Sequence, residues 1–271
     1  MTETLPPGGV TNRALAYGDG LFESMLVCHG EVPFWRYHWQ RLQEGARRLQ
    51  LDIPNEHALR RGVARESGRG SGVLKLVLYR RSSADQRGYC PPGTASEYAV
   101  RFFPGNIVRT GAGEPLRLII CSLRLAWQPA LAGIKHLNRL ENVLACAQVR
   151  QHGADDGLLL DADDNIIEAT GSNVIFLRGR HLYTPELDRC GVHGVALQWL
   201  KTRYPVTVSS IPLASMDGFD ALLLCNSVRG FRVVGQVGHH RFDADRQKAV
   251  VQEYIDEITT AWLQSCSGRD V

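Results

Sequence analysis

The chain has 271 residues, 44% of them hydrophobic and 22% charged, which suits one large or two modest soluble globular domains. Its net charge of +3 comes from scattered rather than clustered arginines, which argues against nucleic acid as a partner, and no apolar stretch is long enough to span a membrane. The seven cysteines show no Cys-x-x-Cys spacing, so we expect reduced thiols in a cytoplasmic protein, with neither a disulfide framework nor a zinc site.

The first part of the chain is predicted to mix helices and strands. Hydrophobic spacing indicates a strand at 21–27, helices at 37–49 and 58–66, and strands at 73–79 and 98–103. Residues 104–115 are rich in Gly and Pro and end the apolar pattern. We therefore expect a smaller N-terminal α/β domain at 1–106, a linker at 107–115 and a larger C-terminal domain at 116–271.

The second part begins with a predicted strand at 116–123. An amphipathic helix is expected from about residue 139 to 151, and the remaining elements are strands at 157–160, 165–169 and 173–177, a helix at 195–202, strands at 206–211 and 221–225, and a helix at 243–264. Helices and strands do not alternate strictly. The pattern thus favours a mixed α+β fold over a doubly wound parallel sheet.

Lys135 is the first candidate for chemistry. Only four of the 31 basic residues of Lys and Arg type are lysines, and Lys, unlike Arg, can lose its proton when buried and act as a nucleophile or base. Its neighbours in 131–137 are mostly apolar, a setting that lowers the pKa of an amine, although most lysines are solvated surface charges. Lys75 is a rival, because it lies within an apolar strand pattern from which its amine could reach solvent. A deprotonated lysine can form a Schiff base with an aldehyde.

Four further segments carry candidate site residues. Glu168 ends a strand pattern, where it is either an outward carboxylate or a partner for a pyridine nitrogen. Gly191–Gly194 opens a helix, and free N–H groups at a helix start favour phosphate. Asn226 and Ser227 end an apolar strand as small polar groups suited to phosphate, and Arg41 is either a phosphate fork or a solvated helix residue.

Taken together, these segments resemble the fold-type IV pyridoxal-phosphate enzymes, and within them the aminodeoxychorismate lyases. Six motifs carry the resemblance and occur in the family's order over roughly residues 13 to 230. They are Arg-Ala-Leu-Ala-Tyr-Gly-Asp-Gly-Leu-Phe-Glu (13–23), His-Trp-Gln-Arg-Leu (38–42), Lys-His-Leu-Asn-Arg-Leu-Glu-Asn (135–142), Glu-Ala-Thr-Gly-Ser-Asn (168–173), Gly-Val-His-Gly (191–194) and Leu-Cys-Asn-Ser (224–227).

The resemblance implies a fold and a cofactor site. The fold is a two-domain α/β architecture like that of D-amino-acid aminotransferases, with pyridoxal 5'-phosphate in the interdomain cleft, a larger domain that binds it, and a homodimer. Lys135 would hold the cofactor and act as acid and base, and Glu168 would pair with the pyridine nitrogen. The phosphate would be held by Arg41, by the amides of Val192 and His193, and by Asn226 with Ser227.

The resemblance also implies a reaction. The expected activity is that of a carbon–oxygen lyase converting 4-amino-4-deoxychorismate to 4-aminobenzoate and pyruvate in folate biosynthesis. The alternative is an aminotransferase of the same fold acting on D-amino acids or branched-chain amino acids, and a member of the fold that binds no cofactor is a third. Because the lyase substrate carries two carboxylates, arginines are expected nearby; the candidates are Arg80, Arg81, Arg87, Arg124 and Arg229.

Overall fold

The computed structural model describes residues 9–82, 88–105, 114–242 and 249–266. The chain divides into two compact units. The smaller unit is Met1–Gly105 with Ile134–Arg139, and the larger is Asn106–Gly133 with Leu140–Val271. Most of the predicted linker, residues 107–113 of 107–115, lies outside the described residues.

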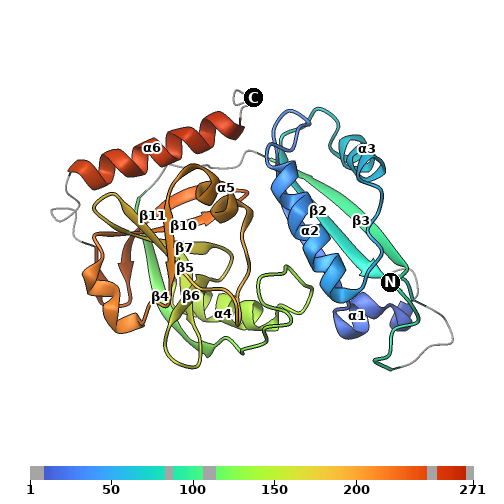
Figure 1. Cartoon of the computed structure of the whole chain (residues 1–271), viewed down its shortest axis with the longest axis horizontal. Coiled ribbons are helices and arrows are strands. Elements are labelled where there is room, and N and C mark those ends of the chain that lie inside the picture. Colours follow the sequence, from blue (N-terminus) through green and yellow to red (C-terminus); the bar gives the residue numbers. More distant parts are fainter. Residues whose placement is uncertain (1–8, 83–87, 106–113, 243–248, 267–271) are drawn as a thin grey trace. The chain divides into compact units, whose positions relative to one another are not determined.

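The smaller unit is built on a three-stranded antiparallel sheet in the order β1-β2-β3 (Figure 1). Its elements, in chain order, are η1 (Gly9–Thr11), α1 (Arg13–Tyr17), β1 (Gly20–Val27), α2 (Trp35–Leu49), α3 (Glu56–Ser67), β2 (Gly72–Arg80) and β3 (Ser96–Pro104). All five elements predicted for this part are confirmed within a few residues at each end. The additional helix α1 is only five residues long, and Asn12 and Gly18 cap its two ends.

Alternation along the strands sends one face of the small sheet into the core. On β2, Leu74, Leu76 and Leu78 are fully buried, while Lys75 on the opposite face is exposed. The helix α2 packs closely on β1, since a Cβ added at Gly45 would come within 2.8 Å of the Leu21 side chain. Larger residues at this position would force the helix away from the sheet.

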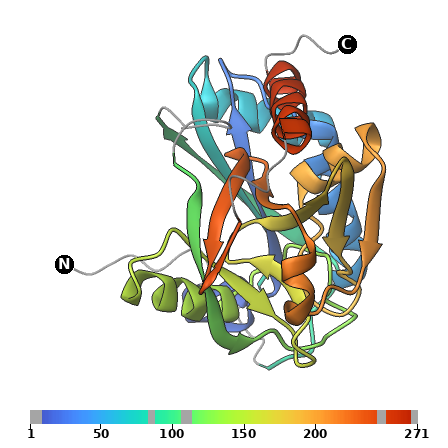
Figure 2. The same ribbon diagram turned by 90° about the vertical axis from the view of Figure 1, so that its left-hand side faces the viewer.

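The larger unit is built on a nine-stranded, curled mixed sheet, shown from a second side in Figure 2. Its elements are β4 (Leu116–Arg124), α4 (Leu140–Gln151), β5 (Asp156–Leu160), β6 (Ile166–Ala169), β7 (Asn173–Arg178), β8 (His181–Pro185), α5 (Val195–Arg203), β9 (Val206–Ser209), η2 (Leu213–Gly218), β10 (Ala221–Asn226), β11 (Gly230–Val237), β12 (His240–Arg241) and α6 (Ala249–Cys266).

The strand order of this sheet is β6-β5-β4-β11-β10-β7-β8-β9, and β12 pairs with β11. The pairs β4–β5, β4–β11 and β8–β9 are parallel, and the others are antiparallel. This mixture confirms that the fold is not a doubly wound parallel sheet.

The central strands of the larger sheet are covered on both faces. Phe176 and Leu222 belong to a core cluster on one face. On another layer, Trp199 of α5 and Trp262 of α6 meet Phe231 of β11, with the two indole centroids 5.0 Å apart. Burial on both faces explains why β7 and β10 appear in the sequence as continuous apolar runs.

Three strands of the larger unit have no counterpart in the sequence prediction. β8 is a short strand that ends at Pro185, β12 has two residues, and β11 is interrupted by Arg232, Gly235 and Gln236. A register shift occurs between Val234 and Gln236, where β11 pairs with β4. Bulges of this kind break the two-residue periodicity on which strand prediction rests.

The helix expected after Lys135 is confirmed as α4, but its predicted amphipathic packing is wrong. Leu140, Val143 and Leu144 are 77%, 60% and 55% exposed, and Ala145 is its buried residue. Within the described ranges, no helix is both long enough and apolar enough to cross a bilayer.

Candidate active site

Backbone hydrogen bonds join the Lys135 segment to strand β1. The N–H of Phe22 donates to the carbonyl of Lys135, and the N–H of Leu137 donates to the carbonyl of Gly20, both at 2.9 Å. Leu21 and His136 form an isolated antiparallel bridge between them. This pairing explains why residues 134–139 belong to the smaller unit, although the sequence prediction placed them in the larger one.

The amine of Lys135 lies over an aromatic ring. Its Nζ is 4.3 Å from the ring centroid of Phe22, and the Nζ of Lys75 is 5.5 Å from the same centroid. The guanidinium of Arg139 donates to the carbonyls of Ile134 and His136, on either side of Lys135 in the chain, and these bonds hold the turn that carries the lysine. Lys75 is exposed, whereas Lys135 is half-buried. The structure therefore gives Lys135 the more constrained setting of the two.

Two histidines in this unit have depressed basicity. Burial, together with the charges of Arg139 and Lys135, lowers the pKa of His136 to about 4. Burial also lowers the pKa of His38, against the raising influence of Glu23. Both rings are therefore neutral near pH 7, and neither adds a positive charge beside Lys135.

Arg41 lies in a buried cluster with Glu23 and His38. Its Nε and Nη2 donate to the two carboxylate oxygens of Glu23 at 2.8 and 2.5 Å, and His38 Nδ1 lies 2.6 Å from Oε2 of the same carboxylate. Burial would raise the pKa of Glu23, but the charges and hydrogen bonds of Arg41 and His38 outweigh it and lower the pKa to about 2. Arg41 is thus a buried, ion-paired residue, and the simple solvated alternative is wrong.

In the larger unit, Glu168 and the Gly191–Gly194 turn form one bonded group. Glu168 is the next-to-last residue of strand β6, is 4% exposed, and accepts a hydrogen bond from the N–H of Val192 at 2.9 Å. The N–H of His193 donates to the carbonyl of Gly133 at 2.9 Å, and Asn173 Nδ2 donates to the carbonyl of Val192 at 2.8 Å. The two amides predicted to hold phosphate therefore already donate within this unit.

The turn leads directly into helix α5. Gly194 is its N-cap residue, and the first helical hydrogen bond runs from the N–H of Gln198 to the carbonyl of Gly194. The N–H groups of 195–197 precede that bond, so they have no intrahelical partner and face along the positive end of the helix. A Cβ added at Gly194 would lie 1.9 Å from Oδ1 of Asn173, so the turn depends on this glycine.

Asn226 and Ser227 lie where β10 ends, as predicted. The Asn226 amide donates to Ser172 Oγ at 2.9 Å, and its Oδ1 accepts from the N–H groups of Val228 and Arg229. Asn226 therefore shapes the loop that carries Ser227, which is buried.

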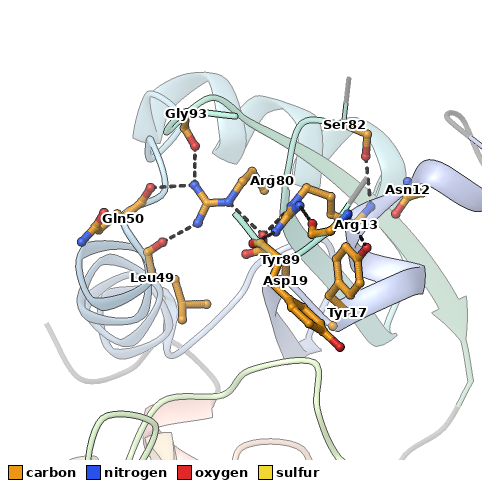
Figure 3. Close-up of polar contacts among 12 residues, drawn as sticks. Asn12, Arg13, Tyr17, Asp19, Leu49, Gln50, Arg80, Ser82, Tyr89 and Gly93 are labelled. Atoms are coloured by element: carbon orange, nitrogen blue, oxygen red, sulfur yellow. Dashed lines mark hydrogen bonds and ion pairs between the residues drawn. The ribbon is translucent and has the colours of Figure 1, made fainter. Parts of the chain in front are cut away.

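The arginines considered for substrate carboxylates divide into structural and surface residues. Figure 3 shows Asp19 between the guanidinium groups of Arg13 and Arg80, whose Nε atoms lie 2.8 and 2.9 Å from Asp19 Oδ2. Arg80 also donates to three backbone carbonyls, those of Leu49, Gln50 and Gly93. The guanidinium of Arg80 thus has a structural role, which removes Arg80 as a candidate ligand for a substrate carboxylate.

The remaining candidates differ in setting. Arg81 pairs with Glu97, and Arg124 with Asp164, in partly exposed ion pairs. Arg229 is exposed at the end of the Asn226 loop, and Arg87 lies outside the described residues.

Glu23, His38, Arg139 and Asn173 lie within the sequence motifs, but no pattern in the sequence predicted an individual role for any of them. A signal for Glu23 was available: it alternates with Leu21 and Met25 on β1, which places a carboxylate on the core-facing side of a strand. A carboxylate in such a position needs a cationic partner. For Arg139 and Asn173, no comparable signal existed, because their partners are backbone carbonyls.

The residues present suit pyridoxal phosphate. Lys135 supplies an amine that can react with the aldehyde of the cofactor. The buried carboxylate of Glu168 suits a protonated ring nitrogen. Arg41 and the N-terminus of α5 are cationic or N–H donors suited to a phosphate.

Comparisons with known proteins identify the family of this chain. The family model described as "Amino-transferase class IV" matches residues 20–237. An aminodeoxychorismate lyase of Vibrio harveyi is 29% identical over 83% of this chain and 86% of its own length. The solved 4-amino-4-deoxychorismate lyase of Pseudomonas aeruginosa is 34% identical, with a TM-score of 0.80 over 95% of each chain.

Aminotransferases are similar to the chain as well. A D-alanine aminotransferase of Listeria monocytogenes is 23% identical over 80% of this chain and 78% of its own length. Members of this family, lyases and aminotransferases alike, use pyridoxal phosphate. The match over most of the chain, together with the shared fold, shows that this protein belongs to the class IV aminotransferase family of fold-type IV pyridoxal-phosphate enzymes.

Proposed function

We propose that this protein is a carbon–oxygen lyase that cleaves 4-amino-4-deoxychorismate to 4-aminobenzoate and pyruvate in folate biosynthesis. The observation that carries the proposal is the 34% identity, over 95% of each chain, to a solved protein described as a 4-amino-4-deoxychorismate lyase. The Lys-His-Leu-Asn-Arg-Leu-Glu sequence that begins at Lys135 supports the lyase over the aminotransferases.

The cofactor supplies two chemical features when bound: an aldehyde that reacts with amines and a ring that accepts electron density. Lys135 would hold it through the amine and would then move protons. The free amine of Lys135 would take the proton from the substrate carbon that bears nitrogen. The same group, now protonated, would deliver a proton to the departing enolpyruvate, which becomes pyruvate. General acid–base help of this kind contributes ~10²–10⁴ in rate.

The other residues would hold and orient. Glu168, kept in place by the N–H of Val192, would hold a proton at the pyridine nitrogen. Arg41 would contact the phosphate, and so would Ser227. Because Val192 and His193 already donate to other groups, their predicted phosphate contacts would require those donors to be shared or exchanged. Asn226 would act by ordering the Ser227 loop.

Aromatisation of the substrate ring supplies much of the driving force. The protein therefore has to position the substrate and relocate one proton, which is consistent with a single lysine serving as base and acid. We further propose that the enzyme works as a homodimer in the cytoplasm, with a small-molecule substrate and neither nucleic acid nor membrane as partner. The seven cysteines all lie in the described part of the chain and none of them is in a disulfide, which fits a reducing compartment.

The decisive experiment compares two assays on the purified yellow protein. We expect formation of 4-aminobenzoate and pyruvate from 4-amino-4-deoxychorismate, and little transfer between D-alanine and 2-oxoglutarate. Rapid transamination without 4-aminobenzoate would contradict the lyase and favour the aminotransferase, for which the Listeria relative is the supporting observation.

A pair of lysine variants tests the cofactor assignment. Lys135→Ala should lose both the visible absorption band and the activity, because Schiff-base chemistry requires the amine. Lys75→Ala provides the matched control, since its amine approaches the same Phe22 ring. Loss of the band in Lys75→Ala alone would show that the lysine was misassigned. A wild-type protein without any band after incubation with pyridoxal phosphate would favour a member that binds no cofactor.

A further inference from the structure

Glu23 is a buried carboxylate for which the proposed reaction has no direct use. It lies on β1 next to Phe22, the residue bonded to the backbone of Lys135, and is 1% exposed. An ionised carboxylate at such a position is costly unless it is paired. Its partners, His38 and Arg41, occupy neighbouring turns of α2 on the face turned toward β1.

The contact between Glu23 and Arg41 orients the plane of the guanidinium in addition to pairing the two charges. Nε of Arg41 donates to Oε1 and Nη2 donates to Oε2, so two parallel hydrogen bonds hold the guanidinium by one edge. A bidentate pair of this geometry restricts rotation of the planar group, which a single ion pair would not.

His38 is a second anchor of the Glu23 carboxylate and shares Oε2 with Arg41. Because Glu23 is ionised, the short contact at 2.6 Å requires His38 Nδ1 to carry the proton and to donate to Oε2. The buried Nε2 of this neutral ring is then an acceptor, and no partner for it is found among the described residues. Hydrogen bonds from Arg41 to both oxygens and from His38 to Oε2 together restrict the orientation of the carboxylate.

We infer that Glu23 is a positioning residue: it orients the guanidinium of Arg41 for the phosphate of the cofactor, with His38 as the second anchor of its carboxylate. The inference rests on the proposed assignment of Arg41 to that phosphate. Groups that are held in their bound orientation before the ligand arrives lose less freedom on binding and therefore bind more tightly.

A purely electrostatic role and a positioning role for Glu23 predict opposite changes in the affinity for phosphate. If Glu23 acted only through its negative charge, it would oppose a phosphate dianion, and removing the charge would tighten phosphate binding. If it acts by holding Arg41, the same change loosens the guanidinium and weakens phosphate binding. Glu23→Gln removes the charge, and Glu23→Asp keeps the charge but withdraws it by one methylene.

The experiment measures the affinities of the full-length protein for pyridoxal phosphate and for pyridoxal, which lacks the phosphate, by spectroscopic titration. We expect both Glu23→Gln and Glu23→Asp to lower the affinity for pyridoxal phosphate about tenfold, the loss of roughly one charge-assisted hydrogen bond, with little change for pyridoxal. Tighter phosphate binding in Glu23→Gln, or a wild-type ratio of the two affinities in Glu23→Asp, would overturn the inference. Should Glu23→Gln fail to fold, Glu23→Asp still decides, because it retains the buried negative charge.

Glu44→Gln is the matched control. Glu44 lies on the same helix and receives a similar bidentate contact from Arg47, with both side chains largely exposed. We expect its ratio of the two affinities to equal that of the wild type. A change as large as that in Glu23→Gln would mean that any carboxylate on α2 has this effect, and would contradict a specific role.

A double-mutant cycle separates this inference from the proposed function. Arg41→Gln alone should lower the affinity for pyridoxal phosphate, and in that background Glu23→Gln should have no further effect. If Arg41→Gln leaves the affinity unchanged, the phosphate assignment of Arg41 fails. If Arg41→Gln matters but the effects of the two changes add, Arg41 keeps its role and the positioning by Glu23 is wrong.

Discussion

The N–H of Val192 donates a hydrogen bond to Oε2 of Glu168, with the two atoms 2.9 Å apart. The family resemblance implies separate roles for the two residues, with the amide of Val192 at the phosphate and Glu168 at the ring nitrogen. This hydrogen bond couples the position of the turn before α5 to that of the buried carboxylate. A displacement of the turn therefore moves the carboxylate as well.

Glu168→Gln should separate charge from structure at this contact. The amide oxygen of glutamine can still accept from Val192, so the turn should persist and the melting temperature should change little. Activity should fall about 10–100-fold, because a hydrogen bond to a charged group is worth about 1.5–3 kcal/mol. The measurement is the rate of 4-aminobenzoate formation together with a thermal melt. Glu186→Gln, an exposed acid in the same unit, should leave both unchanged.

Gly194→Ala should disturb the same group by steric means. The new Cβ would lie 1.9 Å from Asn173 Oδ1, and Asn173 is held by its hydrogen bond to the carbonyl of Val192. We expect a loss of about 1–3 kcal/mol in the free energy of unfolding and weaker cofactor binding. Denaturant unfolding measures the first and titration the second. At Gly171, a Cβ would meet nothing within 4 Å, so Gly171→Ala should be tolerated; equal effects would contradict the steric account.

Asp19→Asn should destabilise the smaller unit. The change leaves the guanidinium groups of Arg13 and Arg80, both largely buried, without their shared counter-charge. Removing one partner of a buried ion pair costs about 3 kcal/mol or more. The free energy of unfolding in urea is the measurement. Glu97→Gln, which breaks the exposed pair with Arg81, should cost less than about 1 kcal/mol.

His136 should make stability fall as the solution becomes acidic. Its pKa is about 4 in the folded protein, because of burial and the nearby charges of Arg139 and Lys135, and near 6.5 in the unfolded chain. Between these values the unfolded chain binds more protons, so the free energy of unfolding decreases as the pH falls from about 6.5 to 4. The full shift corresponds to about 3 kcal/mol, and solvent screening of this partly exposed ring reduces it to about 1–2 kcal/mol.

The comparison of His136→Gln with the wild type measures that contribution. Urea unfolding at pH 4.5 and at pH 7 should give a smaller difference in the variant. His57 is exposed, so His57→Gln should retain the pH dependence of the wild type. An unchanged difference in His136→Gln would show that other groups cause the acid sensitivity.

The parts of the fold that the sequence predicted share a physical property. β7 and β10 are buried on both faces, so each appears as an uninterrupted apolar run, and β2 alternates regularly. β11 lies between β4 and β10, yet its polar and glycine residues conceal it, because a bulge shifts which side chains face the core. Its neighbours compensate for that irregularity, and local periodicity contains no information about neighbours.

The same distinction applies to the candidate site. Lys135, Glu168 and Arg41 were identified because a chemical group or a family motif marks each of them. The roles of Glu23 and Asn173 depend on contacts across long stretches of chain, Glu23 with α2 and Asn173 with the Val192 carbonyl. Strand alternation could have flagged Glu23 as buried, but only the position of α2 identifies its partners.

The attachment of the Lys135 segment to β1 determines what happens when the protein is expressed as two separate fragments. A fragment starting at the predicted linker would encode Lys135 without the strand whose N–H and carbonyl groups hold its backbone at Phe22 and Gly20. In such a fragment, the backbone amides of residues 134–139 should exchange their hydrogens with solvent rapidly. Adding the separately expressed N-terminal piece should restore protection at Leu137, so the protection of that one amide would report reassembly of the lysine with its supporting strand.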